Sequence, residues 1–194
     1  MGKAERTKEL IIEKTAETFN QKGFAGTSMN DITELTGLTK GSIYGNFKNK
    51  DDVAVAVFNH NIEKLRQIFS SEVEKKSSCR EKLLAYPHLY QNYFEAPFPE
   101  GGCPIMNTAI EADDTHPELK ELAQNALLEW KSGLEAILKK GISNNEFNKD
   151  IDVKETAYSI LALIEGGVMM AKLTNSLKPL NAAMNTLKKM INSL

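Results

Sequence analysis

The chain has 194 residues, of which 41% are hydrophobic and 26% charged, and its formal net charge is −2. This composition is ordinary for a globular protein that buries a core. No uninterrupted apolar run reaches the roughly 18 residues of a membrane span, and residues 1–5 lack the apolar stretch of a signal peptide. The two cysteines, Cys79 and Cys103, cannot build a disulfide framework, so we expect a cytoplasmic protein with reduced thiols and no membrane segment.

The charge is distributed unevenly along the chain. Residues 1–50 hold eight lysines and arginines against six acids, a balance of +2 that leaves −4 for the remainder. Residues 35–50 contain no acid but carry Lys40, Lys48 and Lys50. A locally basic stretch in a mildly acidic chain is typical of a small phosphate-contacting surface, although three lysines on a solvated face are also common.

Residues 5–22 form the first predicted helix, because apolar or small side chains recur there at helical spacing. The recurring positions are Leu10 or Ile11, Thr15 or Ala16, and Phe19. Gly23 follows as a glycine typical of a helix C-terminus.

Two short helices are predicted next. Ser28 starts an S-x-x-D pattern that ends at Asp31, in which the serine hydroxyl caps a free amide of the first turn. This helix ends before Gly37, and Thr39 then caps another short helix over residues 40–46. Two short helices joined by a glycine-containing turn of three or four residues form a helix-turn-helix.

The rest of the chain is also predicted to be helical. A long helix begins at Asn49 or Lys50 and continues to about Lys75, and further helices are expected at about 78–96, 103–112, 116–143, 153–173 and 178–193. We therefore expect an all-α fold of about nine helices. Residues 1–50 would form a three-helix head, and residues 51–194 would form a connecting helix and a five-helix body.

The second short helix of the head has the features of a DNA-reading helix. Such a helix needs small or polar side chains at its N-terminus, because base edges in the major groove carry the sequence information. Gly41 lets the backbone approach DNA closely, while Lys40 and Ser42 reach bases or phosphates. Tyr44 lies off the buried face, so its hydroxyl can bind a phosphate. Lys50 begins the next helix, where the helix dipole and the ammonium group both attract an anion.

The opposite side of this short helix is expected to anchor it. Ile43 and Phe47 lie four residues apart and point into the core of the head. Their expected neighbours are Phe19, Phe24, Ile32 and Leu35.

The spacing of these residues resembles the N-terminal signature of the TetR (tetracycline-repressor) family. The matching positions are Gly23-Phe24-x-x-Thr27-Ser28-x-x-x-Ile32, followed by Gly37-Leu38-Thr39-x-Gly41-x-Ile43-Tyr44-x-x-Phe47-x-x-Lys50. One departure concerns the residue before Phe47, which is histidine in many relatives and Asn46 here. Asn46 can still donate to a phosphate or a base, but the operator preference of relatives does not carry over.

The resemblance implies a set of DNA-binding residues. Phosphate contacts are implied for Thr27, Ser28, Tyr44 and Lys50, and base-facing positions for Asn30, Lys40, Gly41 and Ser42. The alternative for Thr27 and Ser28 is that they only cap helices, and we expect Ser28 to do both. Lys48 is equally well explained by solvation.

A single head would hold DNA weakly, so a homodimer is expected, with two recognition helices in successive major grooves about 34–36 Å apart. Its surface is predicted on the last two helices, where apolar side chains recur on one face of each. The candidate positions are Leu180, Met184, Leu187, Ile191 and Leu194 on the last helix, Ile160, Leu163, Ile164 and Val168 on the one before, and Gly166 and Gly167 for close approach. The alternative is that these positions are interior to a monomeric bundle, and the family resemblance favours the dimer seam.

In the TetR family the C-terminal body usually encloses a small-molecule pocket. The candidate effector-binding residues combine an apolar surface with a few hydroxyl groups. They are Tyr86, Tyr90, Tyr93, Phe94, Cys103, Met106 and Trp130. Aromatic residues at helical spacing are more often core, and Pro87 is expected to kink their helix.

Cys103 has a further interpretation. It precedes a predicted helix, whose N-terminus raises the thiolate fraction of a cysteine. The Gly101-Gly102-Cys103 arrangement also resembles a TetR subgroup that includes regulators responsive to electrophiles. A reactive sensor thiol is therefore one hypothesis, and an inert buried cysteine is the other.

No enzymatic site is expected. His60, His88 and His116 are far apart in the sequence and belong to no H-E-x-x-H or H-x-x-x-H pattern. The chain has no C-x-x-C pair and no nucleotide-binding glycine loop, and nothing indicates a metal or another cofactor.

The sequence thus predicts a homodimeric TetR-like repressor that binds a palindromic DNA operator and releases it when a small-molecule effector occupies the body. A ligand-dependent activator or corepressor-type regulator fits the same residues. A helical ligand-binding or enzymatic protein with a vestigial head is the alternative from another class. In the first two cases the helix over residues 50–75 would connect the effector site to the head.

Overall fold

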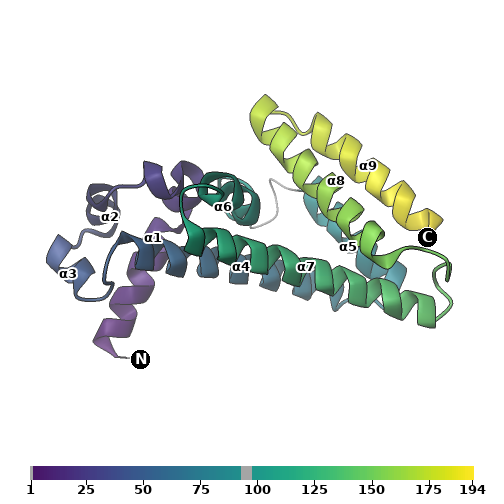
Figure 1. Cartoon of the computed structure of the whole chain (residues 1–194), viewed down its shortest axis with the longest axis horizontal. Helices are drawn as coiled ribbons and strands as arrows, with labels where there is room; N and C mark the ends of the chain where they lie inside the picture. Colours follow the sequence, from purple (N-terminus) through teal and green to yellow (C-terminus); the bar gives the residue numbers. More distant parts are fainter. Residues whose placement is uncertain (1, 93–97) are drawn as a thin grey trace. The chain divides into compact units, whose positions relative to one another are not determined.

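The computed structural model describes residues 2–92 and 98–194, and these residues form helices joined by turns, without strands (Figure 1). The chain divides into two compact units. We call residues 1–65 and 99–124 the N-terminal unit, and residues 66–98 and 125–194 the C-terminal unit. The predicted division at residue 50 into a DNA-binding domain and an effector domain concerns function and stays a prediction.

The helices of the described residues follow one another as predicted. They are α1 (Lys3–Gly26), α2 (Met29–Thr36), α3 (Lys40–Tyr44), α4 (Lys50–Val73), α5 (Cys79–Gln91), α6 (Pro104–Ala112), α7 (Pro117–Ser143), α8 (Val153–Thr174) and α9 (Lys178–Ser193). The all-α class with about nine helices is confirmed. Helix α5 is described only to Gln91, although the predicted helix extended to residue 96, and residues 93–97 lie outside the described part of the chain.

Gly23 ends the regular part of α1, as predicted. Its φ of +75° and ψ of −179° are not helical, and one further turn follows before the helix ends at Gly26. A positive φ is easily adopted only by glycine, because glycine has no Cβ. The chain therefore changes direction at Gly23, directly before the helix-turn-helix.

The core of the N-terminal unit gathers around the residues that were expected to anchor the recognition helix. Ile43 and Phe47 are buried together with Ile11, Phe19 and Ile32, and Phe24 packs against them while remaining partly exposed. The prediction for Leu35 was wrong, because its side chain is 40% exposed. Helix α2 has only eight residues and turns Ile32 inward, and Leu38, after the turn, packs against the core instead.

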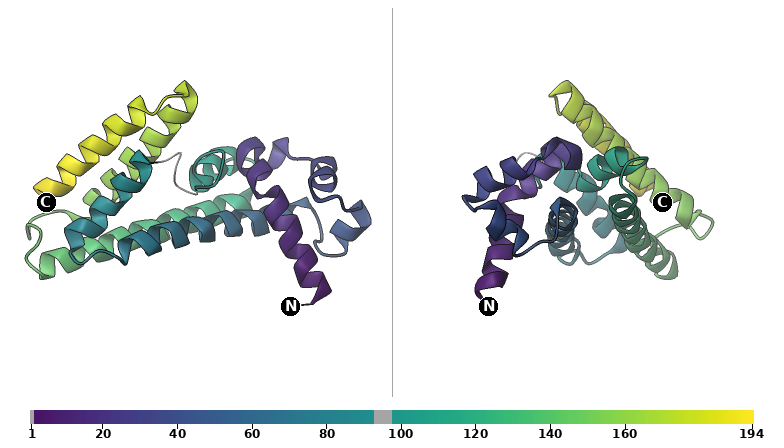
Figure 2. Two further views of the ribbon diagram at one scale, coloured as in Figure 1. Left: turned by 180° about the vertical axis from the view of Figure 1, so that it is seen from behind. Right: turned by 60° about the vertical axis from the view of Figure 1, so that its left-hand side comes forward.

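Helices α8 and α9 form an antiparallel pair in the C-terminal unit, visible side by side in Figures 1 and 2. Helix α9 also packs against α5. The apolar stripe predicted as the dimer surface lies inside this arrangement. Leu180, Met184, Leu187 and Ile191 of α9 and Ile160 and Ile164 of α8 have no exposed surface, and Val168 is buried.

For these seven residues the assignment to a dimer seam is therefore corrected to interior packing within one chain. Leu163 and Leu194 are partly exposed, so their part in a dimer surface stays a prediction. A Cβ at Gly167 would lie 3.0 Å from Leu180 Cδ1 and 3.1 Å from Ala183 Cβ, so this glycine allows α8 to approach α9 of the same chain. A Cβ at Gly166 would meet no atom within 4 Å, so Gly166 faces open space. Sequence periodicity locates an apolar face but does not say which helix covers it.

Among the described residues, one helix is long and apolar enough, by length and composition alone, to cross a membrane. This helix is α8, and the core helices of soluble proteins pass the same test. Only 33% of its most apolar window is buried within the chain. The large apolar side chains of α8 that remain exposed are Tyr158, Met169, Met170 and Leu173, which we call the α8 stripe.

Candidate DNA-binding site

Helix α2 begins with the predicted capping box. The Asp31 amide donates to Ser28 Oγ at 3.1 Å, and Asp31 Oδ2 accepts from the Ser28 amide at 2.8 Å. Hydrogen bonds from Ser28, and then one from Lys22 Nζ at 3.0 Å, hold the pKa of the Asp31 carboxyl well below its usual range. At the other end of α2, Gly37 adopts a φ of +68° and closes the helix. Both ends of α2 are thus fixed by the residues that predicted them.

We expect Ser28→Ala to lower the free energy of unfolding by about 1 kcal/mol, because a helix N-cap contributes roughly that amount. Urea unfolding of the free protein measures this difference. The control is Ser77→Ala, an exposed serine of the C-terminal unit. Equal unfolding midpoints for the two variants would contradict a capping role for Ser28.

Helix α3 is shorter than predicted, with five residues that end at Tyr44. Thr39 caps it as predicted, since Thr39 Oγ1 accepts from the Ser42 amide at 3.2 Å. The amides of Asn46 and Phe47 both donate to the Ile43 carbonyl at 2.9 Å, so the chain turns tightly after the helix. Because Ile43 and Phe47 are buried, this short element is held firmly from one side.

The opposite side of α3 faces solvent. Lys40 and Gly41 are exposed, Ser42 is partly exposed, and 50% of Tyr44 is accessible. A Cβ added to Gly41 would meet only Thr39 Oγ1, at 3.9 Å, so packing within the protein does not require glycine there. The missing side chain instead leaves room for a partner that approaches α3 from outside. Asn30, in the first turn of α2, is exposed as well.

Besides Ser28, whose hydroxyl caps α2, three of the predicted DNA contacts have partners within the protein. The first two are Thr27 and Asn46. Thr27 is fully buried and its hydroxyl donates to the Gly23 carbonyl at 2.7 Å. Asn46 Nδ2 donates to the Ser42 carbonyl at 2.8 Å. Their contacts with DNA stay predictions, but these side chains also stabilise the fold of the free protein.

Lys50, the third of these residues, is bound even more closely to the head. Its Nζ donates to the carbonyls of Phe24 at 2.7 Å and Thr27 at 3.0 Å, and it lies 4.0 Å from the centroid of the Phe24 ring. An ammonium group has three N–H donors, so the described hydrogen bonds use two of them. Phosphate binding by the third donor stays a prediction.

One cation near this surface was missed by the sequence analysis. Lys8 Nζ, from α1, lies 5.6 Å from the centroid of the Phe47 ring, just beyond the end of α3. The local motif around residues 27–50 does not include α1. Only the positive balance of residues 1–50 indicated further cations near the DNA-reading helix.

The predicted effector-binding residues fall into different parts of the chain. Tyr86 and Tyr90 are buried in the C-terminal unit, in an aromatic cluster with Phe69, Phe98 and Trp130. The ring centroids of Phe69 and Tyr86 are 5.0 Å apart, and those of Tyr90 and Phe98 are 5.1 Å apart. Tyr93 and Phe94 lie outside the described residues. Cys103 and Met106 belong to the N-terminal unit, where Cys103 is buried directly before α6.

The cluster contains one polar atom of interest. Trp130 Nε1 is buried, and no described residue accepts a hydrogen bond from it in good geometry. The indole nevertheless lies close enough to the Tyr86 hydroxyl to lower its pKa, while burial, the larger effect, raises the pKa of Tyr86 to about 12.

Tyr86 gives an expected dependence of stability on pH. An unfolded tyrosine ionises near pH 10, whereas the buried hydroxyl stays protonated up to about pH 12. Stability from this group is therefore complete below pH 10 and is lost as pH rises toward 12, by about 2–3 kcal/mol in total. Urea unfolding of the wild type and Tyr86→Phe at pH 9 and pH 11.5 (roughly the two ends of the interval) measures it. Equal losses in both proteins would contradict the shift.

No group of three or more His, Cys, Asp and Glu side chains that could hold a metal ion occurs in residues 2–92 and 98–194. The only chemistry that the exposed face of α3 offers is hydrogen bonding and a cationic charge. These are the interactions with which proteins contact phosphates and base edges.

In comparisons with known proteins, both halves of the chain match models of one family. A family model described as "Bacterial regulatory proteins, tetR family" matches residues 11–57, and one described as "Tetracyclin repressor-like, C-terminal domain" matches residues 79–187. A solved TetR-family transcriptional regulator from Cytophaga hutchinsonii is 43% identical, covers 100% of this chain and 97% of its own, and superposes with a TM-score of 0.96.

Two further relatives agree with this match. A solved TetR transcriptional regulator from Chloroflexus aurantiacus is 35% identical, with coverage of 99% of this chain and 97% of its own and a TM-score of 0.94. The probable HTH-type transcriptional regulator ArpR of Pseudomonas putida is 27% identical over 169 residues, which cover 84% of this chain and 79% of the relative.

Proposed function

Because the chain belongs to the TetR family of bacterial transcriptional regulators, which are not enzymes, we propose that it represses transcription as a homodimer bound to a palindromic DNA operator. A small-molecule effector in the C-terminal unit would release it. The observation that carries this proposal is the exposed face of α3. Lys40, Gly41, Ser42 and Tyr44 face outward from a helix that Ile43 and Phe47 hold from behind.

The proposed roles of the head residues follow from their positions. Lys40 and Ser42 would read base edges, with Gly41 allowing close approach, and the half-exposed Tyr44 would bind a phosphate. Asn30 and Ser28 would contact the same groove edge from α2. Thr27, Asn46 and Lys50 would act mainly by holding these residues in place, since their side chains have partners within the protein.

The homodimer would form through the α8 stripe rather than through the buried face of α9. Leu173 is 80% exposed and the other three members of the stripe are between 40% and 52% exposed. Tyr158, Met169 and Leu173 share one side of α8, because they are spaced by eleven and four residues. Gly166 faces open space beside them and would let the partner helix approach closely. The last two helices stay the proposed interface, with its residues changed.

The effector would bind at the aromatic cluster of the C-terminal unit. The cluster supplies flat apolar surfaces, the Tyr86 hydroxyl and the buried Trp130 Nε1 donor. An effector that fits these groups has an aromatic or otherwise flat apolar part and one hydrogen-bond acceptor. We place the protein in the cytoplasm, where its DNA target lies.

The same geometry would serve a ligand-dependent activator, because activation or repression depends on where the operator lies relative to the promoter. It would also serve a corepressor-type regulator, whose effector strengthens DNA binding instead of weakening it. A ligand-binding protein with a vestigial head is disfavoured by the intact caps and the open face of α3. Reporter transcription with and without the protein distinguishes repressor from activator.

The direct test is binding to DNA from upstream of the protein's own gene. We expect the protein to bind that fragment at least about 1,000-fold more tightly than a shuffled fragment of equal length, as specific DNA-binding proteins do. Fluorescence anisotropy at fixed salt concentration measures both affinities. Equal affinities for the two fragments would contradict a regulator of that region.

A further inference from the structure

The break in α1 leaves backbone groups without their helical partners. In an uninterrupted helix the Phe24 amide would donate to the Asn20 carbonyl. Because Gly23 leaves the helical conformation, the amides of Phe24 and Ala25 instead donate to the carboxylate of Glu111, both at 2.8 Å. The Asn20 carbonyl accepts from Asn107 Nδ2 at 3.0 Å.

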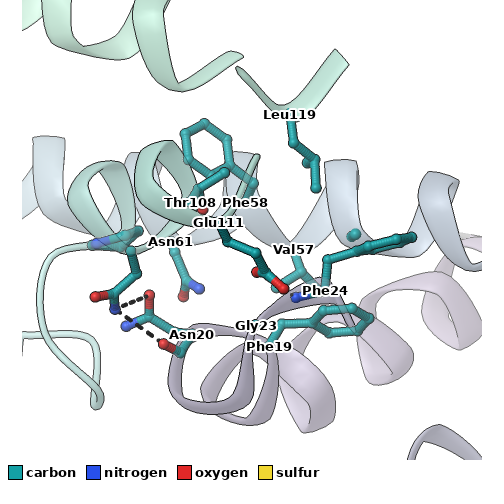
Figure 3. A pocket seen from close by; sticks show the side chains of 13 residues that line it. Phe19, Asn20, Gly23, Phe24, Val57, Phe58, Asn61, Thr108, Glu111 and Leu119 are labelled. Atoms are coloured by element: carbon teal, nitrogen blue, oxygen red, sulfur yellow. Dashed lines mark hydrogen bonds between the residues drawn. The ribbon is translucent and has the colours of Figure 1, made fainter. Parts of the chain in front are cut away.

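The two side chains that satisfy these groups come from one face of α6. Asn107 and Glu111 are four residues apart, so they point to the same side of the helix. Figure 3 shows Glu111 reaching to the backbone at Gly23 and Phe24, and its dashed lines mark hydrogen bonds at Asn20. Asn107 Nδ2 donates to the carbonyl of Asn20 and to Asn20 Oδ1. We call Asn107 and Glu111 together the α6 latch.

Two glycines make room for this arrangement. A Cβ at Gly23 would lie 2.3 Å from Glu111 Oε2, so a side chain there would displace the carboxylate. A Cβ at Gly101, whose φ is +91°, would lie 3.0 Å from the Asn20 carbonyl oxygen. Asn20 Nδ2 also donates to the Gly102 carbonyl at 2.9 Å, which ties the turn before α6 to α1. The contact between α1 and α6 is therefore built on polar bonds as well as on packing.

The segment from Gly23 to Thr27 is held from two sides with opposite charges. The α6 carboxylate of Glu111 binds its amides, and the α4 ammonium of Lys50 binds its carbonyls. The next residue, Ser28, is the N-cap of α2, so the position of this segment determines where the helix-turn-helix begins.

The cavity beside this segment is too small for an effector. It has a volume of about 30 Å³ and is lined by residues of α1, α4 and α6, including Asn61 and Thr108, and by Leu119 of α7 (Figure 3). Pockets for small molecules have roughly 300–1,000 Å³, whereas this space suits one or two waters. The polar groups that line this cavity thus stabilise the contact between α1 and α6.

We propose that Glu111 is a positioning residue for DNA binding, which fixes the segment from Gly23 to Thr27, and through it the helix-turn-helix, on α6. This inference rests on the proposed DNA-binding function. DNA binding then depends on where α6 lies, because any displacement of α6 by more than a hydrogen-bond length separates Glu111 from the two amides.

The test compares Glu111→Gln with the matched control Glu121→Gln, an exposed glutamate of α7 in the same unit. Both variants lose one negative charge, so any general charge effect on DNA affinity is equal. In Glu111→Gln the introduced amide group offers one weaker acceptor in place of two carboxylate oxygens. We expect affinity for the upstream fragment to fall about tenfold or more in Glu111→Gln only, with affinity for the shuffled fragment changed less than about twofold. A merely structural loss would lower both affinities by the same factor.

A second measurement needs no DNA. Amide hydrogen exchange followed by NMR should become faster at Phe24 and Ala25 in Glu111→Gln, while the amides of residues 11–20 keep their rates. Asn107→Leu removes the donor to the Asn20 carbonyl and should weaken binding to the upstream fragment in the same way. This second variant tests the inference even if Glu111→Gln folds poorly.

The outcomes separate the inference from the proposed function. Unchanged exchange at Phe24 and Ala25, or equal upstream affinities of the Glu111 and Glu121 variants, would overturn the role of Glu111. If the wild type itself does not distinguish the upstream from the shuffled fragment, the proposed regulation of that region fails, and the exchange rates still decide whether Glu111 holds this segment.

Discussion

We expect the replacement of Lys40 and Tyr44 together by alanine to lower the affinity for the upstream DNA fragment by about 1,000-fold while the protein stays folded. Each side chain is exposed, so its loss costs little in stability. The base contact proposed for Lys40 contributes about 1–3 kcal/mol, and the phosphate contact proposed for Tyr44 adds about 1 kcal/mol or more. In a homodimer each substitution is present in both heads. A total loss of about 4 kcal/mol corresponds to the stated factor.

Lys50 is left out of this variant on purpose. Its Nζ holds the carbonyls of Phe24 and Thr27, so Lys50→Ala would disturb the head even if the lysine never touched DNA. The control is Lys149→Ala, which removes an exposed positive charge from the C-terminal unit. Fluorescence anisotropy measures affinity, and circular dichroism checks the fold. Affinity within about threefold of the control would show that α3 does not face the DNA.

We expect the replacement of Met169 and Leu173 together by glutamate to convert the proposed dimer into a monomer and to lower operator affinity by about 100- to 10,000-fold. Four negative charges would meet across a two-fold interface, where they would be desolvated without partners. The second head would then no longer bind as part of the same molecule, and linkage of two binding modules commonly contributes that factor.

Sedimentation velocity measures the oligomeric state of this variant. Both residues are exposed in the single chain, so the monomer is expected to stay folded. The control is Ile110→Glu, which places one negative charge at a 72% exposed apolar position of the N-terminal unit. A dimer that persists in Met169→Glu, Leu173→Glu would place the interface elsewhere.

The helices and the helix-turn-helix could be predicted from the sequence because their signals are local. Ser28 and Asp31 cap α2, Gly37 closes it, and Thr39 caps α3, and each of these contacts joins residues at most four apart. Burial of Ile43 and Phe47 followed from their spacing. The end of α3 was placed too late, since the tight turn after Tyr44 depends on how Phe47 packs.

The errors concern which surface covers an apolar face. The stripe of Leu180, Met184 and Leu187 was correctly identified as apolar, but α8 and α5 of the same chain cover it. Leu35 was expected in the core because it is apolar, yet the short α2 buries only Ile32. Periodicity does not contain this information, because it depends on how helices distant in the sequence come together.

The contact of Glu111 with the Phe24 and Ala25 amides could not be predicted either, because it also joins helices that are distant in the sequence. Its carboxylate binds amides that lie 87 and 86 residues away along the chain, and those amides are free only because Gly23 breaks α1. An acid on a helix is ordinarily solvated, so the residue type alone indicated nothing. Gly23 was predicted to end the first helix. That this end also frees two amides for a carboxylate of α6 depends on where α6 lies, which the sequence does not show.

Hydroxyl-radical footprinting of the upstream fragment tests most directly whether two heads read DNA through α3. We expect two protected half-sites related by two-fold symmetry, with centres about 10–10.5 base pairs or a multiple of that apart. The protection should disappear in the Lys40→Ala, Tyr44→Ala variant and persist in Lys149→Ala. A single protected patch, or protection that survives the α3 substitutions, would contradict the account.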